Sequence, residues 1–249
     1  MIAGIALVVA LQGPKLETFQ VNGVARQANV VLPADLSKPA PLVFGFHGHG
    51  GNMRNAQRSF GIERYWPEAI VVYPQGLPSK GKTDPKGEKN GWQQNAADYD
   101  GRDIAFFDTM LKAIEKEYKV DVNRVYSMGH SNGGRFTYLL WAERGDTFAA
   151  VAPSASPAIG LARKLKPLSA FIVAGEKDQL VSFQSQKLSI DWVERLLEAD
   201  SSKAKVDGYL SVEPAPNGLE LATYVFPGPH TFPPEVSAKV VEFFKRHHR

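Results

Sequence analysis

The chain has 249 residues, of which 43% are hydrophobic and 22% are charged, and its formal net charge is +3. These values are typical of a globular domain and argue against disorder, a fibrous repeat or a membrane protein. The lysines and arginines are interspersed with acidic residues, so no nucleic-acid partner is predicted. The chain contains no cysteine, which excludes disulfides, cysteine-ligated zinc and thiol catalysis.

The N-terminal residues 1–16 are predicted to be a signal-like or disordered segment ahead of a single domain at 17–249. Residues 1–12 are apolar but too few to cross a bilayer. They resemble a secretory signal with a small-residue cleavage site after Ala10, although they lack the Lys or Arg expected at the start of such a signal. Two interpretations stay open: a secreted or periplasmic protein, or a cytoplasmic protein in which this run is a first strand or the result of an ill-chosen start codon.

Alternating strands and helices predict a mostly parallel sheet that is covered by helices on both faces. A hairpin over residues 17–32, around Asn22-Gly23, would supply antiparallel leading strands. Further strands are predicted at 42–46, 69–73, 124–126, 148–152, 170–174 and 219–226. Helices are predicted at 103–118, 134–144, 182–198 and 235–247, with Asp100 and Asp103 capping the first of them.

A long polar loop occupies residues 74–99 and is rich in Gly, Pro and Lys. Loops of this length are usually functional or mobile. It leaves the same edge of the predicted sheet as the strand at 124–126, so we expect it to border a site there. Its one Trp, Trp92, either anchors the loop to the body or offers a flat surface to a substrate.

The segment Gly129-His130-Ser131-Asn132-Gly133 lies between a predicted strand and a predicted helix. Gly-x-Ser-x-Gly in this context is the pattern of a nucleophile elbow, a sharp turn that exposes the serine. The pentapeptide alone also fits an ordinary tight turn. Ser131 is the candidate nucleophile.

A serine nucleophile needs a histidine base, and that histidine needs a carboxylate to hold it. Of the six histidines, His230 follows the last predicted strand, whereas His247 and His248 are expected to be solvated in the terminal helix. Asp178 follows the strand at 170–174 and is the predicted acid, with Glu176 as its rival in the same loop. The order Ser131, Asp178, His230 is that of a hydrolase triad.

The tetrahedral oxyanion also needs N–H donors. One is predicted to be the N–H of Asn132, the residue after the nucleophile, and the other the N–H of His49 in the loop His47-Gly48-His49-Gly50-Gly51. The backbone of this glycine-rich loop could approach a substrate closely.

These motifs, together with Gly175-x-x-Asp178-x-x-Val181 and Gly228-x-His230-Thr-Phe-Pro233, resemble the α/β-hydrolase group of polyhydroxybutyrate depolymerases, feruloyl esterases and acetylxylan esterases. The similarity spans about residues 20–244 and implies carboxylic-ester hydrolysis by Ser131, Asp178 and His230. The chain departs from many members at two positions, with His49 in place of Cys and Phe232 in place of Trp.

The predicted function is a serine ester hydrolase that acts on short-chain, aryl or polyester substrates through an acyl-enzyme. Trp92, Phe183 and Phe232 are the predicted substrate-binding residues. The connection at 154–168 is too short for a cap, which favours an open cleft. No cofactor or metal is expected. An acyltransferase or serine peptidase of the same fold remains an alternative, as does a non-catalytic binding protein, and the oligomeric state is not predicted.

Overall fold

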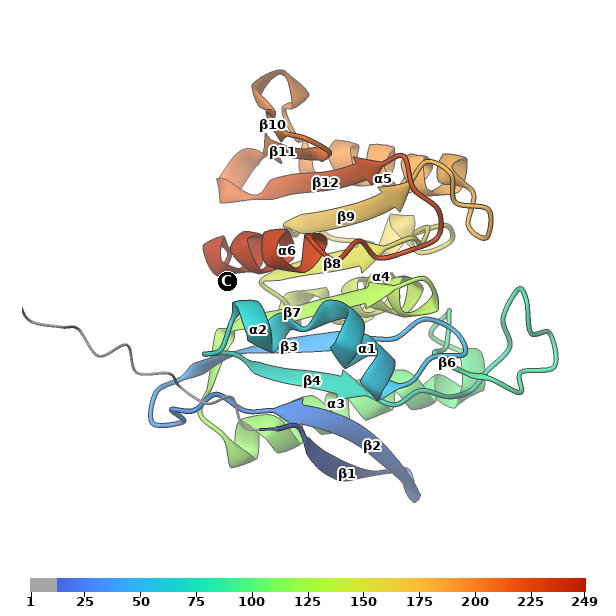
Figure 1. Ribbon diagram of the computed structural model, residues 1–249, viewed down its shortest axis with the longest axis vertical. Coiled ribbons are helices and arrows are strands. Elements are labelled where there is room, and N and C mark those ends of the chain that lie inside the picture. The colour runs from blue at the N-terminus through green and yellow to red at the C-terminus, as the bar shows by residue number, and fades with distance from the viewer. Residues whose placement is uncertain (1–12) are drawn as a thin grey trace, which may run out of the picture.

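The computed structural model describes residues 13–249, and its main feature is a twisted ten-stranded sheet (Figure 1). The strand order is β1-β2-β4-β3-β7-β8-β9-β12-β11-β10. Strands β4, β3, β7, β8, β9 and β12 run parallel, and an antiparallel hairpin lies at each edge. The bounds are β1 Lys15–Val21, β2 Val24–Val31, β3 Ala40–Phe46, β4 Ile70–Pro74, β7 Val120–His130, β8 Ala150–Ser154, β9 Ala170–Gly175, β10 Lys205–Asp207, β11 Leu210–Pro214 and β12 Glu220–Phe226.

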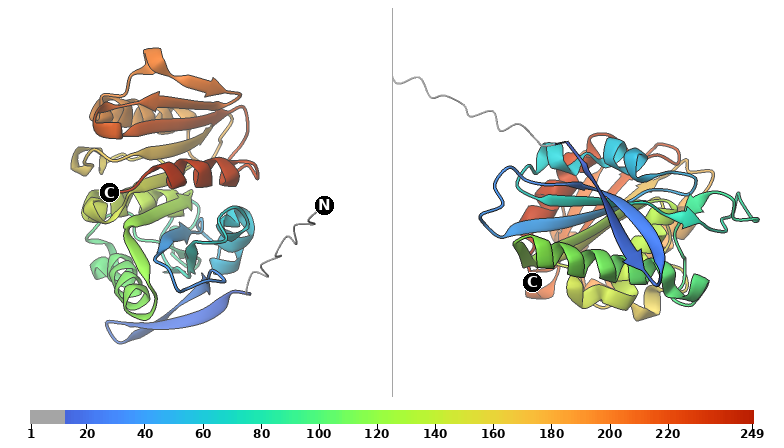
Figure 2. Two further views of the ribbon diagram at one scale, coloured as in Figure 1. Left: turned by 90° about the vertical axis from the view of Figure 1, so that its left-hand side faces the viewer. Right: turned by 90° about the horizontal axis from the view of Figure 1, so that it is seen from below.

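Helices cover both faces of this sheet, as Figures 1 and 2 show. Helices α3 (Arg102–Glu117), α4 (Asn132–Arg144) and α5 (Phe183–Leu197) enclose one hydrophobic core. Helices α1 (Met53–Phe60), α2 (Ile62–Tyr65) and α6 (Val236–Arg246) enclose the other. The central strands are apolar along their whole length because both of their faces are buried, and β3 is buried at every position.

The structure confirms the predicted layers and refines several elements. The domain begins earlier than residue 17, because β1 already includes Lys15 and Leu16. The signal-like run at 1–12 lies outside the described residues. Strand β7 is eleven residues long, and the hairpin of β10 and β11 at the far edge was not predicted.

The predicted capping role of Asp100 and Asp103 is wrong. Gly101 occupies the N-cap of α3, and Oε1 of Gln93 accepts from the first-turn N–H groups of Asp103 at 2.7 Å and Ile104 at 3.1 Å. Asp103 is instead fully buried, and its Oδ1 pairs with Arg26 Nη2 at 2.9 Å. The pair ties α3 to β2, the second strand of the sheet.

The carboxyl ends of the parallel strands share one edge of the sheet, at the right in Figure 1. The loop between β4 and α3 projects from this edge and contains a two-stranded ribbon of β5 (Leu77–Pro78) and β6 (Asn90–Gly91). The connection from β8 to β9 contains only a 3₁₀ turn at Ala162–Lys164, so it forms no cap over this edge. None of the helices within residues 13–249 is long and apolar enough to cross a membrane.

Candidate active site

Ser131 occupies a strained turn between β7 and α4. Its backbone dihedral angles are φ 58° and ψ −119°, a combination that L-residues rarely adopt. Its N–H donates to Ser154 O at 2.8 Å, which ties the turn to β8. A Cβ at Gly129 would overlap the Gly133 carbonyl, and one at Gly133 would overlap the Phe46 carbonyl. Both glycines are therefore required for the turn to pack, as the elbow motif predicts.

His230 and Asp178 lie together at the same edge. His230 follows β12 and Asp178 follows β9, and these two strands are neighbours in the sheet. His230 Nδ1 lies 2.7 Å from Asp178 Oδ2, so an Nδ1–H donates to the carboxylate and leaves Nε2 as the basic nitrogen. The rival acid, Glu176, is exposed and has no hydrogen bond to His230.

The carboxylate of Asp178 is buried and well supplied with donors. Burial alone would raise the pKa of Asp178, but the hydrogen bonds from Val181 N–H, His230 and Leu180 N–H outweigh it and hold the pKa below its ordinary value. The two N–H groups approach Oδ1 at 2.8 Å and 2.9 Å. Asp178 therefore stays ionised beside His230.

Gln186 is a supporting residue that sequence reasoning missed. Its side chain is buried, and Nε2 donates to Asp178 Oδ2 at 2.9 Å and to Val181 O at 2.8 Å. It thus fixes the same carboxylate oxygen that holds His230. Its position soon after the acid loop is the one sequence signal, and its burial and its contacts are visible only in the structure.

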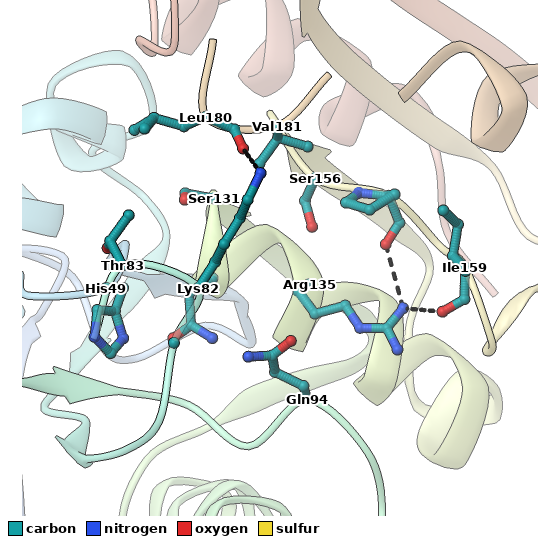
Figure 3. A pocket seen from close by; sticks show the side chains of 13 residues that line it. His49, Lys82, Thr83, Gln94, Ser131, Arg135, Ser156, Ile159, Leu180 and Val181 are labelled. Carbon is teal, nitrogen blue, oxygen red and sulfur yellow. Dashed lines mark hydrogen bonds between the residues drawn. The ribbon is translucent and has the colours of Figure 1, made fainter. Parts of the chain in front are cut away.

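Ser131 opens into a cavity of about 330 Å³, which Figure 3 shows from close by. His49 and Asn132 line the cavity with it. Gly48 is close to the nucleophile, since a Cβ built on it would lie 3.5 Å from Ser131 Cβ. Within residues 13–249 the backbone N–H groups of His49 and Asn132 have no acceptor. Both predicted oxyanion donors are therefore free to serve a ligand.

His130 lies on the other side of the turn from this cavity. Its Nδ1 is 3.1 Å from Ser154 Oγ, and its ring centroid is 4.9 Å from that of His230. Burial, and then the neighbouring His230, lower the pKa of His130 to about 3. His130 therefore remains neutral and adds no positive charge next to the candidate base.

The structure corrects one of the three predicted substrate-binding residues, Trp92. Trp92 is fully buried, stacks on Phe136 at 5.3 Å and donates from Nε1 to His47 O at 2.9 Å, so it anchors the loop and offers no surface for a substrate. Phe183 is partly buried against the core and is not among the residues that line the cavity with Ser131, so its role in substrate binding stays a prediction. Phe232 lines a separate cavity of about 240 Å³ with Gly48, Phe60 and His130.

The expectation that His247 is solvated is also wrong. The side chain is buried, and its Nδ1 lies 2.8 Å from Phe243 O. The Tyr126 hydroxyl donates to the His247 carbonyl at 2.6 Å, which joins the end of α6 to β7. His247 thus has a structural role far from the elbow. His248 is exposed, as expected.

The predicted loop does border the site. From the β4–α3 connection, Gly81, Lys82, Thr83 and Gln94 line the cavity, and the opposite wall includes Pro157, Ile159, Leu180 and Val181. Among residues 13–249, no group of three or more His, Asp or Glu side chains could hold a metal ion.

The curated proteins to which the chain is similar are named as esterases. No protein-family model matches the chain. It is 34% identical over 139 residues to feruloyl esterase C of Emericella nidulans, a match covering 53% of this chain and 46% of that protein. It is 28% identical over 166 residues to a bifunctional acetylxylan esterase/xylanase of Neocallimastix patriciarum, covering 66% of this chain and 23% of the relative. The chain thus spans less than two thirds of the length of these curated relatives.

Similarity to solved structures identifies the fold of the chain. An acetyl xylan esterase from Aspergillus awamori superposes with a TM-score of 0.68 at 15% identity, covering 93% of this chain and 99% of that one. The chain has the α/β-hydrolase fold. A ferulic acid esterase from Anaeromyces mucronatus, solved with ferulic acid, has a TM-score of 0.60 at 18% identity over 97% of this chain and 93% of that one. Proteins of this fold place their active site at the sheet edge that carries Ser131, Asp178 and His230 in this chain.

Proposed function

We propose that this protein is a serine carboxylic-ester hydrolase that acts through an acyl-enzyme. The observation that carries the proposal is the Asp178–His230 hydrogen bond of 2.7 Å at the sheet edge where Ser131 occupies a strained elbow. The relatives named feruloyl esterase and acetylxylan esterase support the same reaction class.

In the proposed reaction, Ser131 Oγ attacks the ester carbonyl carbon while His230 Nε2 accepts the hydroxyl proton. Asp178 keeps the Nδ1–H tautomer and stabilises the imidazolium that forms. The N–H groups of His49 and Asn132 donate to the oxyanion, and loss of one such donor costs about 10²–10³-fold in kcat.

The tetrahedral intermediate collapses when the C–O bond to the alcohol breaks and His230 returns its proton to the leaving oxygen. The acyl group is then an ester of Ser131. Water attacks this ester while His230 removes its proton, and the carboxylic acid leaves with Ser131 restored. No redox partner or metal is needed to balance these steps.

The cavity supports small acyl or aryl groups as substrates. Its volume of about 330 Å³ is near the lower end for ligand pockets, and Pro157, Ile159, Leu180 and Val181 give it apolar walls. Acetyl esters and feruloyl-type aryl esters fit this size. Polyester ends presented at an open cleft remain within the proposal.

The test is turnover by the purified protein of p-nitrophenyl acetate, methyl ferulate and acetylated xylan. We expect hydrolysis of at least one of them and its loss in Asp178→Asn, with Glu176→Gln as the matched control that keeps activity. Added alcohol acceptors separate a hydrolase from an acyltransferase, because a transferase would yield mainly the new ester. Absence of turnover on all esters, or an inactive Glu176→Gln with an active Asp178→Asn, would contradict the proposal.

A further inference from the structure

The charges around the cavity that holds Ser131 are of one sign. Lys82 and Arg135 are its two formally charged lining residues, and none of the lining residues is an Asp or Glu. Arg135 lies one helical turn after Ser131 on α4. Lys82 reaches in from the β4–α3 loop. A neutral acetyl or aryl ester carries no negative charge with which these two cations could pair.

Arg135 is held by neutral acceptors. Its Nη1 donates to Pro157 O at 3.2 Å and to Ile159 O at 2.7 Å, and its Nη2 donates to Asn95 Oδ1 at 3.3 Å. Within the described chain its Nε makes no hydrogen bond. No carboxylate of residues 13–249 lies within 4.0 Å of the guanidinium. Burial lowers the pKa of Arg135, which means that the positive charge is poorly solvated where it stands.

Asp98 is the acid whose charge acts on Arg135, but its carboxylate forms its hydrogen bonds with other groups. Its Oδ2 accepts from Gln94 N–H at 3.0 Å and from Asn95 N–H at 2.9 Å. Asp98 therefore offsets the charge of Arg135 from a distance and leaves the cavity side of the guanidinium without an anionic partner.

Lys82 also has a neutral partner. Its Nζ donates to Leu180 O at 3.1 Å, and Figure 3 shows its side chain stretched across the cavity to reach that carbonyl. The side chain is exposed and forms no salt bridge with the residues that the structure describes. An anion in the cavity would attract this ammonium away from a single carbonyl contact.

We propose that this cavity binds esters that carry a carboxylate, with Arg135 and Lys82 as the residues that recognise it. The inference rests on the proposed ester hydrolysis and names the substrate class of that site. The carboxylate stands on either half of the ester: on the acyl half, as in a monoester of a dicarboxylic acid, or on the alcohol half, as in an acylated uronic acid. A planar guanidinium with a free Nε–H suits a carboxylate better than a hydroxyl group.

The experiment compares matched pairs of esters by kcat/KM at low ionic strength. For the acyl half the pair is ethyl hydrogen adipate and diethyl adipate, and for the alcohol half it is acetylated glucuronic acid and acetylated glucose. In one of the two pairs we expect a preference of about tenfold for the charged ester, expressed mainly in KM, because one charge-assisted contact gives about this factor. The preference should shrink in about 0.5 M salt, because salt screens the attraction between charges and the screening length is already only ~10 Å at about 0.1 M.

Variants assign the preference to residues. Lys82→Gln and Arg135→Gln should each bring the ratio of the preferred pair toward one, whereas Lys86→Gln, an exposed lysine of the same loop outside the cavity, should keep it. Arg135→Gln could loosen the 157–159 segment, so its melting temperature is measured alongside. Lys82→Gln changes an exposed side chain and keeps the inference testable if Arg135→Gln fails to fold.

Binding measured by calorimetry separates this inference from the proposed function. Ser131→Ala should bind the charged ester of the preferred pair about tenfold more tightly than its neutral partner, whether or not the native protein turns it over. Ratios near one in both pairs, or a preference that Lys82→Gln and Arg135→Gln both leave intact, would overturn the inference while ester hydrolysis stands. Absence of turnover on every ester would contradict the proposed function alone.

Discussion

The side chain of Asn132 pairs with both backbone groups of Trp92. Asn132 Oδ1 accepts from Trp92 N–H at 2.6 Å, and Asn132 Nδ2 donates to Trp92 O at 3.1 Å. The side-chain amide thus pairs with the Trp92 backbone as a neighbouring strand would, and it joins the first residue of α4 to the long β4–α3 loop. Since Asn132 follows Ser131 directly, this contact couples the elbow to the loop that borders the cavity.

Asn132→Ala should therefore lower both activity and stability although the backbone N–H proposed to donate to the oxyanion is retained. We expect kcat to fall about tenfold and the free energy of unfolding to fall by about 1–2 kcal/mol, because two buried backbone groups lose their partner. Asn132→Asp should be at least as damaging, since a carboxylate oxygen would face Trp92 O. Steady-state kinetics and urea denaturation check both values, and an Ala variant with native kcat would show that the contact does not position the site.

Trp92 is predicted to act through the fold and not through substrate contact. Trp92→Phe keeps most of the packing against Phe136 but removes the hydrogen bond to the His47 carbonyl, so stability should fall by about 1–3 kcal/mol. KM should change by the same factor for aryl and acetyl esters. A selective rise in KM for aryl esters at unchanged stability would instead indicate a stacking surface.

His47 should make the fold sensitive to acid. Its Nδ1–H donates to Gly48 O at 2.8 Å and its Nε2 accepts from Gly76 N–H at 2.9 Å, so the ring must be neutral. Burial lowers the pKa of His47 to about 4, below the value of 6.5 for an unperturbed imidazole. Between these two pH values the unfolded chain binds a proton that the folded chain does not, so stability falls as pH falls.

The slope of unfolding free energy against pH measures this effect. His47 contributes up to about 1.4 kcal/mol per pH unit between pH ~6.5 and ~4. His47→Gln should be less stable at pH 7 but should have a flatter slope, while His248→Gln, at an exposed position, should keep the native slope. An unchanged slope in His47→Gln would mean that another group causes the acid sensitivity.

The short β8–β9 connection predicts a site without a lid. Rates should fall as the acyl chain lengthens beyond about butyrate, because the cavity is small and open. Rates should rise smoothly as substrate passes its solubility limit. A jump in rate at that limit, or faster hydrolysis of palmitate than of acetate esters, would indicate that the β4–α3 loop acts as a lid.

Much of this arrangement follows from local sequence patterns. The Gly-x-Ser-x-Gly turn, the apolar strands and the chain order of Ser131, Asp178 and His230 each depend on a few neighbouring residues or on the topology of parallel strands. The choice of Asp178 over Glu176 also agrees with the structure, because only Asp178 approaches His230.

Features that depend on contacts between distant segments were not predictable. Trp92 is buried because its loop folds back onto α4, and His247 is buried because α6 packs along β7. Gln186 and Asn132 both act through side-chain hydrogen bonds across turns that no periodicity reveals. Lys82 and Arg135 were ordinary surface charges in the sequence, and only the cavity brings them together.

The most direct test of the account is covalent labelling of Ser131. A fluorophosphonate probe reacts with an activated serine, so mass spectrometry of the digested protein should locate the label on Ser131. Labelling and p-nitrophenyl acetate turnover should both be lost in Ser131→Ala, and both should fall by several orders of magnitude in His230→Ala, while Ser156→Ala, at another serine of the cavity, should still be labelled. Undiminished labelling and turnover in Ser131→Ala would contradict the assignment of the nucleophile and, with it, the proposed mechanism.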